Sequence, residues 1–209
     1  MTIDANRVRR LFQDGKAGQR MVAVVLYHSE KKGKFYRVAN EKDLEVYRHA
    51  EEYLQKKVEE LRKKWGIEPI PDEPTPEGKG KGAERAFSVR NYGLNTWSDL
   101  FNSRQKLALI TFVDKVREAY RKMVDGGYDK EYAKAVVTYL GLAVDMTAAF
   151  CNTLARWENT SEAIKQLYSR QALPMLWDYV ESNPFSCSSG SWEAGWEYYL
   201  KVLQHCSRV

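Results

Sequence analysis

Two short runs of β-branched and aromatic residues near the N-terminus predict a β-hairpin. The runs are residues 21–27 (MVAVVLY) and 34–38 (KFYRV), and the polar residues between them end in Gly33. An isolated two-stranded hairpin is only marginally stable in water. We therefore expect this hairpin to pack on the rest of the molecule or to pair with strands from outside the chain.

Helical periodicity begins directly after the hairpin. Asn40, with Asp43 three residues later, is typical of a helix start, and apolar residues then recur at helical spacing as far as Trp65 and Gly66. The opposite face is almost wholly charged. This pattern predicts one long amphipathic helix with a solvated outer face.

A segment rich in proline and glycine follows this helix. Residues 67–85 (IEPIPDEPTPEGKGKGAER) contain four of the six prolines and three glycines. Such composition is typical of a linker or a mobile loop. We therefore divide the chain into a hairpin with its helix (1–66), a linker or loop (67–90) and a helical region (91–209).

The pattern of residues 91–209 predicts successive helices. Asn102 or Ser103 is a candidate cap for a helix that Gly126-Gly127 stops. Asp129 is a candidate cap for a second helix, which runs towards Trp157 and is apolar on most faces, so we expect it to be the central buried helix.

Three further helices are expected towards the C-terminus. One begins at residues 160–162, and one is started or kinked by Pro174, which has no amide hydrogen to donate. The last follows Gly190-Ser191 and carries the sequence WEAGWEYYLKVLQH. The expected fold is mainly α: a multi-helix domain with a small N-terminal β-hairpin.

Composition agrees with a globular protein of ordinary size. The 209 residues are 44% hydrophobic, which is enough for one or two domains with a real core. Three cysteines are too few for a disulfide framework, and no apolar run approaches the ~20 residues of a membrane span. We expect a cytoplasmic protein without membrane contact.

The net charge is modest and unevenly distributed. The formal charge is +5, and residues 1–90 hold 20 basic against 15 acidic side chains, so the excess lies in the first part of the chain. Such an excess permits a polyanionic partner without demonstrating one.

The usual catalytic signatures are absent from the sequence. It contains no GxxxxGK[ST], no GxGxxG after a strand, no HExxH and no GxSxG. The three histidines lie far apart and have no partner at the spacing of a metal site. The Gly- and Lys-rich residues 78–82 are more typical of a solvated loop than of a phosphate cradle, because no strand and helix pattern flanks them.

Two segments have sequences too particular to be explained by helix packing alone. The first is residues 91–105, NYGLNTWSDLFNSRQ, and the second runs from ARWENT (155–160) through YSRQALPMLWDYVESNPF (168–185) to Gly190-Ser191-Trp192. Together they resemble the middle region of the adenine-specific DNA methylases that contain a zinc ribbon, a family often grouped with anti-phage and restriction-modification methylases. Residues 32–47 (KGKFYRVANEKDLEVY) are similar to the segment after the ribbon, so the resemblance covers essentially the whole chain.

The resemblance implies an S-adenosylmethionine-dependent enzyme of which this chain is only a part. Its glycine-rich cofactor loop, its zinc-ribbon cysteines and its DPPY catalytic motif are all missing here. Asn183-Pro184-Phe185 is similar to a shortened catalytic motif, but a turn is favoured for it. We expect no methyl transfer by this chain alone, and a catalytic methylase domain or subunit as its partner.

A region between cofactor loop and catalytic motif is a natural place for DNA contacts. The candidate nucleic-acid-binding residues are Lys31, Lys32, Lys34, Lys79, Lys81, Arg104 and Arg170. For the arginines, each followed by glutamine and an expected apolar helix, internal ion pairs with Asp99, Asp178 or Glu181 are favoured over base or phosphate contacts. The candidate pocket-lining residues are Asn183, Phe185, Ser189 and Trp192.

Two functions from different classes remain open. In the first, the chain is the DNA-contacting accessory or target-recognition region of an adenine DNA methyltransferase. In the second, it is a helical scaffold for protein partners and binds no nucleic acid. Most of the tryptophans are expected to fill the core in either case.

Overall fold

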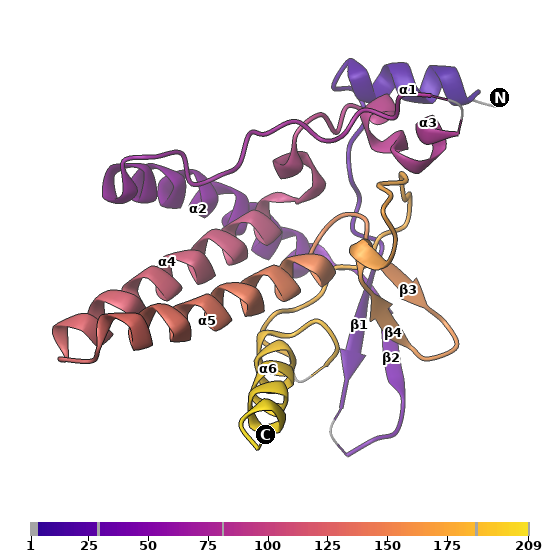
Figure 1. Cartoon of the computed structure of the whole chain (residues 1–209). Helices are drawn as coiled ribbons and strands as arrows, with labels where there is room; N and C mark the ends of the chain where they lie inside the picture. Colours follow the sequence, from indigo (N-terminus) through magenta and orange to yellow (C-terminus); the bar gives the residue numbers. More distant parts are fainter. Residues whose placement is uncertain (1–3, 29, 81, 187, 209) are drawn as a thin grey trace.

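The computed structural model describes residues 4–28, 30–80, 82–186 and 188–208, and it is mainly helical as the sequence predicts (Figure 1). The predicted hairpin is confirmed. Strands β1 (Ala23–Tyr27) and β2 (Lys34–Val38) pair antiparallel, with Val25 opposite Tyr36. In Figure 1 this hairpin points downwards beside the C-terminal helix and away from the other helices.

The long amphipathic helix is confirmed as α2 (Glu41–Trp65). Its capping box is formed by Asn40 and Asp43, and Gly66 ends it in the left-handed conformation that glycine adopts without strain. Both oxygens of Asp43 also accept hydrogen bonds from Arg37 in β2, at 2.6 and 2.8 Å. This bidentate pair ties the hairpin to the first turn of the helix.

An N-terminal helix, α1 (Ala5–Gln13), was not predicted. It packs against the 3-10 helix η1 (Ser88–Tyr92), where the rings of Phe12 and Tyr92 meet edge to face. Between α2 and η1, the short helix α3 (Ala83–Ala86) follows the Pro-rich segment. That segment is fixed at Thr75, which is 2% exposed and whose amide donates to the carbonyl of Asn95 at 2.8 Å.

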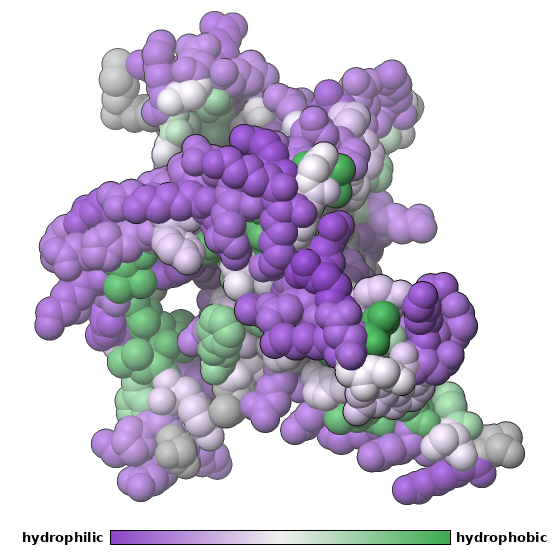
Figure 2. All heavy atoms as spheres, turned by 90° about the vertical axis from the view of Figure 1, so that its left-hand side faces the viewer, coloured by the Kyte–Doolittle hydropathy of each residue, from purple (hydrophilic) through white to green (hydrophobic). Residues whose placement is uncertain are grey.

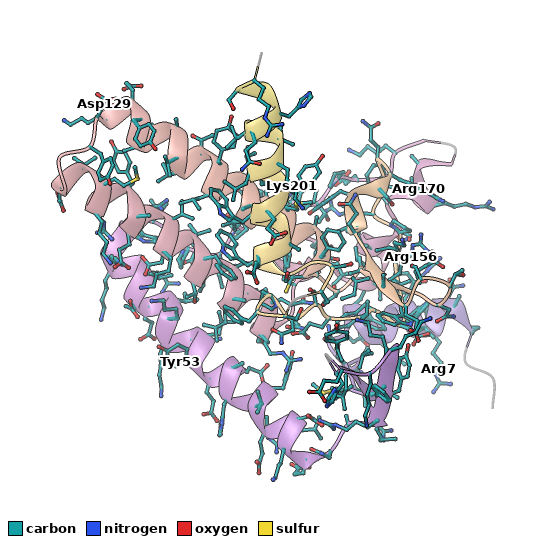
Figure 3. The ribbon with its side chains drawn as sticks, turned by 90° about the horizontal axis from the view of Figure 1, so that it is seen from below. Arg7, Tyr53, Asp129, Arg156, Arg170 and Lys201 are labelled. Atoms are coloured by element: carbon teal, nitrogen blue, oxygen red, sulfur yellow. The ribbon has the colours of Figure 1, made fainter. Side chains whose placement is uncertain are left out.

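A helical hairpin forms the largest part of the body. Helix α4 (Ser103–Asp125) is capped by Asn102, and α5 (Lys130–Phe150) is capped by Asp129, as predicted. The two helices lie side by side in Figures 1 and 3. Preceding α4, a second 3-10 helix, η2 (Trp97–Leu100), places Leu100 in the core, where it is fully buried.

Helices α2 and α4 pack through an apolar seam with an ionic group beside it. One buried cluster joins the two helices and consists of Leu54, Val58 and Leu61 of α2 and Ile110 of α4. The carboxylate of Asp114, which is 3% exposed, accepts a hydrogen bond from Lys64 at 2.6 Å and lies 3.5 Å from Lys57. The α2–α4 interface therefore combines apolar burial with a charge that is paired from the opposite helix.

The expectation that the second apolar helix is central and buried is wrong. In α5, burial is concentrated near the C-terminal end, at Ala143, Val144, Thr147 and Ala149, while Tyr132 and Leu142 are exposed. The helix packs mainly on α4 and on the last helix, α6 (Trp192–Cys206), which leaves much of its outer face uncovered. By length and composition alone α5 is apolar enough to cross a membrane, but a single such helix is weak evidence.

The helix expected from residue 160 is absent, because this segment forms a second hairpin. Strands β3 (Arg156–Glu158) and β4 (Ala163–Lys165) pair antiparallel. Trp157 packs edge to face on Tyr36 of β2, and the Tyr36 hydroxyl donates to Glu162 at 3.1 Å. These contacts between distant segments favour the extended conformation over a local helix.

The helix expected at Pro174 is absent as well. After the 3-10 helix η3 (Leu167–Ser169), the backbone amides find partners far away in sequence instead of four residues back. Leu173 donates to the carbonyl of Ala86 at 2.6 Å and Val180 to that of Ala155 at 2.9 Å, while Met175 donates to the Ser88 hydroxyl. Residues 170–191 thus contain no helix in the described positions. The last helix, α6, follows Gly190-Ser191 as predicted, and Ser191 is its cap.

Replacing Asp114 by asparagine tests the ionic contact between α2 and α4. Burial alone would raise the pKa of Asp114, but hydrogen bonding to Lys64 and the charges of Lys64 and Lys57 outweigh burial and lower it. We expect Asp114→Asn to reduce the free energy of unfolding by about 2 kcal/mol at neutral pH, measured by urea denaturation.

The lowered pKa also sets the sign of the pH dependence. The stabilisation is complete above the pKa of an unfolded aspartate, about 3.9, and declines as the pH falls below it. Asp114→Asn should therefore lose less stability than wild type on acidification through this range. Equal losses in both proteins would show that the pair contributes nothing.

Candidate functional site

The two distinctive sequence segments meet at the start of α4. The side chain of Asn102, from the first segment, donates from Nδ2 to Glu181 Oε2 at 2.9 Å and to the Tyr179 hydroxyl at 3.1 Å. Arg104 donates from Nε to the other carboxylate oxygen of Glu181 at 2.6 Å. Residues some 77 to 79 positions apart in the chain therefore form one polar cluster.

Local structure explains why Asn102 can occupy this position. It is the N-cap of α4, and its Oδ1 accepts from the amide of Gln105 while Gln105 Oε1 accepts from the amide of Asn102, both at 2.9 Å. This capping box uses the oxygen of the amide side chain and leaves its nitrogen free to reach Glu181 and Tyr179. Asn102 is 6% exposed, so each of these bonds is shielded from water.

The cluster continues towards β1 and α2. The Tyr179 hydroxyl donates to Gln19 Oε1 at 2.7 Å, which fixes the chain four residues before β1 begins. On the other side, the guanidinium carbon of Arg104 lies 5.6 Å from the centre of the Tyr47 ring in α2. The cluster thereby joins four parts of the molecule.

Two members of the cluster, Tyr179 and Arg104, keep one protonation state near neutral pH. Burial raises the pKa of Tyr179 to about 12, although the hydrogen bond from Asn102 opposes the shift. Burial lowers the pKa of Arg104, but the hydrogen bond and charge of Glu181 more than compensate and raise it. Tyr179 therefore stays a neutral hydroxyl and Arg104 a cation, and the directions of donation are fixed.

An open cleft of about 2000 Å³ borders this cluster. Its walls are β1 with the residues before it, the facing sides of α2 and α4, the β3–β4 hairpin, and residues 175–186, 188 and 189. Figure 2 shows hydrophobic surface, in green, beside a hollow between the hairpin at lower left and the rest of the molecule. Arg104, Tyr179 and Glu181 all contribute to the lining.

The cleft includes most of the residues considered as pocket-lining from the sequence. Asn183, Phe185 and Ser189 line it, and Phe185 is 80% exposed. Asn183 Oδ1 accepts from the amide of Phe185 at 3.0 Å, so the Asn-Pro-Phe sequence forms a local turn. Trp192 instead stacks on Phe112 of α4, with ring centres 4.7 Å apart.

The lysine candidates lie in two separate places. Lys31 and Lys32 belong to the turn of the β1–β2 hairpin, at the bottom of Figure 1, and Lys34 is the first residue of β2. Lys79 precedes α3, which is at the top of that view, and pairs with Glu77 at 2.7 Å. Lys81 lies outside the described residues. The structure therefore does not unite these lysines in one patch.

The two arginine candidates differ sharply in environment. Arg104 is paired with Glu181, one of the three carboxylates considered as partners. Arg170 was expected near the start of a helix, but no helix begins there. Its exposed side chain makes no hydrogen bond or ion pair within the described part of the chain. In Figure 3 it lies on the same side as Arg7 and Arg156, opposite Asp129 at the tip between α4 and α5.

Sequence reasoning missed Tyr179, Gln19 and the dual role of Asn102. The cap position of Asn102 was visible in the sequence, but its free amide hydrogens have partners only because the chain returns to α4 at residues 179–181. No sequence spacing signals that return. Among residues 4–28, 30–80, 82–186 and 188–208, no cluster of three or more His, Cys, Asp or Glu side chains is placed to hold a metal ion.

Comparison of the chain with protein-family models, with curated proteins and with solved structures finds no match.

Asn102→Ala tests the junction, with Asp129→Ala as the matched control at the cap of α5. Both variants lose a helix cap, which costs about 1 kcal/mol, but Asn102→Ala also leaves Glu181 and Tyr179 without their shared donor. We expect Asn102→Ala to cost about 2 kcal/mol more than Asp129→Ala, measured by urea denaturation. Equal costs would contradict the role of Asn102 as a junction.

Proposed function

We propose that this chain is the DNA-contacting accessory region of an S-adenosylmethionine-dependent, adenine-specific DNA methyltransferase. It works in the cytoplasm with a catalytic methylase domain, which belongs either to the same polypeptide or to a separate subunit. The observation that carries the proposal is the meeting of the two segments on which the resemblance rests. Asn102 and Arg104 of the first bind Glu181 of the second, at the edge of one open cleft.

The glycine-rich segment of this chain does not fit S-adenosylmethionine in the manner of a Rossmann-type loop. A cofactor loop of the Rossmann type needs a glycine-rich turn between a strand and a helix that offers its N-terminus. The Gly- and Lys-rich residues 78–82 are preceded by no strand among residues 67–80 and are followed by the four-residue helix α3. We therefore assign the cofactor and the methyl transfer to the catalytic partner.

The β1–β2 hairpin is the best candidate for contact with DNA. Its turn projects from the helical body and carries Lys31 and Lys32, both exposed, with Lys34 at the start of β2 (Figure 1). Lys31 and Lys34 lie over the rings of Phe35 and Tyr27, at 5.9 and 4.6 Å from the ring centres. Cationic side chains beside exposed aromatic rings suit binding to a phosphate backbone.

Replacing the three hairpin lysines by glutamine tests this contact. We expect Lys31→Gln/Lys32→Gln/Lys34→Gln to weaken binding to a fluorescent DNA duplex, measured by anisotropy over a series of NaCl concentrations. The slope of log K against log salt should flatten by nearly one unit for each phosphate that the variant no longer neutralises.

The control removes three lysines from the exposed face of α2, as Lys42→Gln/Lys56→Gln/Lys63→Gln. Both variants lose three positive charges. A larger loss of DNA affinity in the hairpin variant would therefore reflect the position of its lysines and not the net charge. Equal effects would contradict the hairpin contact. Failure of the wild-type chain to bind duplex DNA at low salt would favour the alternative, a helical scaffold for protein partners without nucleic-acid binding.

A methyl-transfer assay tests whether cofactor binding and methyl transfer belong to the catalytic partner. The purified chain, mixed with DNA and radiolabelled S-adenosylmethionine, should transfer no methyl groups and should show no cofactor binding by calorimetry. Micromolar affinity for the cofactor together with methylation of DNA, without any partner, would contradict the proposal that this chain is an accessory region.

A further inference from the structure

The size and lining of the cleft define what it can accept. Its volume of about 2000 Å³ exceeds the ~300–1000 Å³ of typical small-molecule sites. Ten aromatic side chains line it, while its charged residues balance: Arg20, Lys34, Arg104 and Lys115 against Asp43, Glu162, Asp178 and Glu181. A groove for nucleic acid carries a clear excess of positive charge, whereas the core of a protein interface is aromatic and nearly neutral. The cleft therefore suits a protein partner.

The hairpin that borders the cleft is incompletely covered. Val22, Leu26 and Phe35 are 69%, 41% and 41% exposed, although they belong to one face of a two-stranded sheet. Two side chains of β2 attach the hairpin to other elements. Arg37 bonds to Asp43 in α2, and Tyr36 contacts the β3–β4 hairpin. A two-stranded sheet with so much apolar surface in water gains stability from further cover.

The free edge of β1 presents main-chain hydrogen-bonding groups. The amide of Ala39 donates to the carbonyl of Val22, which makes this pair a hydrogen-bonded one. Because bonded and non-bonded pairs alternate in an antiparallel ladder, Val24 and Leu26 bond to β2, while Ala23, Val25 and Tyr27 turn their amides and carbonyls away from it. Within the described residues these outward groups have no main-chain partner.

Arg104 presents a second set of donors. Its Nε is bound to Glu181, but its terminal nitrogens Nη1 and Nη2 have no hydrogen-bond partner among the described residues. Each carboxylate oxygen of Glu181 already accepts a hydrogen bond, one from Asn102 and one from Arg104. Glu181 therefore holds the Arg104 side chain in place. Any occupant that excludes water from this side chain must bring acceptors to these nitrogens, because a buried donor without a partner is costly.

These two requirements describe one occupant. We propose that the cleft binds an extended segment of a partner protein, which adds a strand to the free edge of β1 and places a carboxylate on Arg104. Strand addition supplies the main-chain partners, and the carboxylate matches the fork of Nη1 and Nη2. The identity of this partner as the catalytic methylase domain rests on the proposed function.

Selection from a random peptide library, displayed on phage, tests this inference with the wild-type chain as bait. We expect enriched peptides to alternate apolar and polar residues and to share one Asp or Glu. Replacing that residue by Asn or Gln in a synthetic peptide should weaken binding at least about tenfold, measured by calorimetry.

Two pairs of variants then locate the contact. Val25→Pro removes an outward amide of β1, and Val38→Pro removes an outward amide on the far edge of the same hairpin, so only the first should lose the peptide. Arg104→Gln should abolish the preference for the acidic residue, whereas Arg156→Gln, at an exposed pair with Glu158, should not. Circular dichroism and thermal melting check that each variant folds.

Several results would overturn the inference. These are the absence of enriched peptides, equal binding by the Val25→Pro and Val38→Pro variants, an acidic preference that survives Arg104→Gln, and competition by single-stranded DNA. Dimerisation through the cleft, seen by analytical ultracentrifugation and abolished in Val25→Pro, would assign it to a second copy of this chain. A chain that binds duplex DNA but no peptide would contradict this inference alone, and one that selects peptides but ignores DNA would contradict only the DNA contact.

Discussion

The hydrogen bonds of Asn102 hold together parts of the molecule that no continuous secondary structure connects. Its oxygen caps α4, and its nitrogen holds Glu181 and Tyr179. Residues 170–191 have no helix in their described positions, so no helical ladder of hydrogen bonds pairs their backbone groups. Their position on the helical body depends on partners such as this one, and with it depend the shape of the cleft and the orientation of Arg104.

A second constraint is the small amount of support that the β1–β2 hairpin receives. Its ties through Arg37 to Asp43 and through Tyr36 to Trp157 and Glu162 position it over the cleft. These ties leave much of its apolar surface exposed. The same feature thus connects fold and function: a hairpin held at two points leaves one edge, one turn and much of its surface available to other molecules.

The proposed functions use largely different parts of this hairpin, and Lys34, at the start of β2, is the lysine that also lines the cleft. The lysine-bearing turn is assigned to DNA, whereas the edge of β1 and Arg104 are assigned to a protein segment. The charge distribution agrees with this separation, because the lysines gather at the turn while the charged residues of the cleft balance. An accessory region that contacts both DNA and a catalytic domain would orient one relative to the other.

The sequence by itself determined the elements whose signals are local. The hairpin, α2, α4, α5 and α6 follow from β-branched and aromatic runs, helical spacing and caps such as Asn40, Asn102 and Asp129. Only the tertiary structure decided the course of residues 156–191, where helices were expected. There the amides of Leu173 and Val180 bond to distant carbonyls, and Trp157 packs on Tyr36. Such pairings depend on which segments meet in space, so neither this segment nor the cleft that it completes can be read from local pattern.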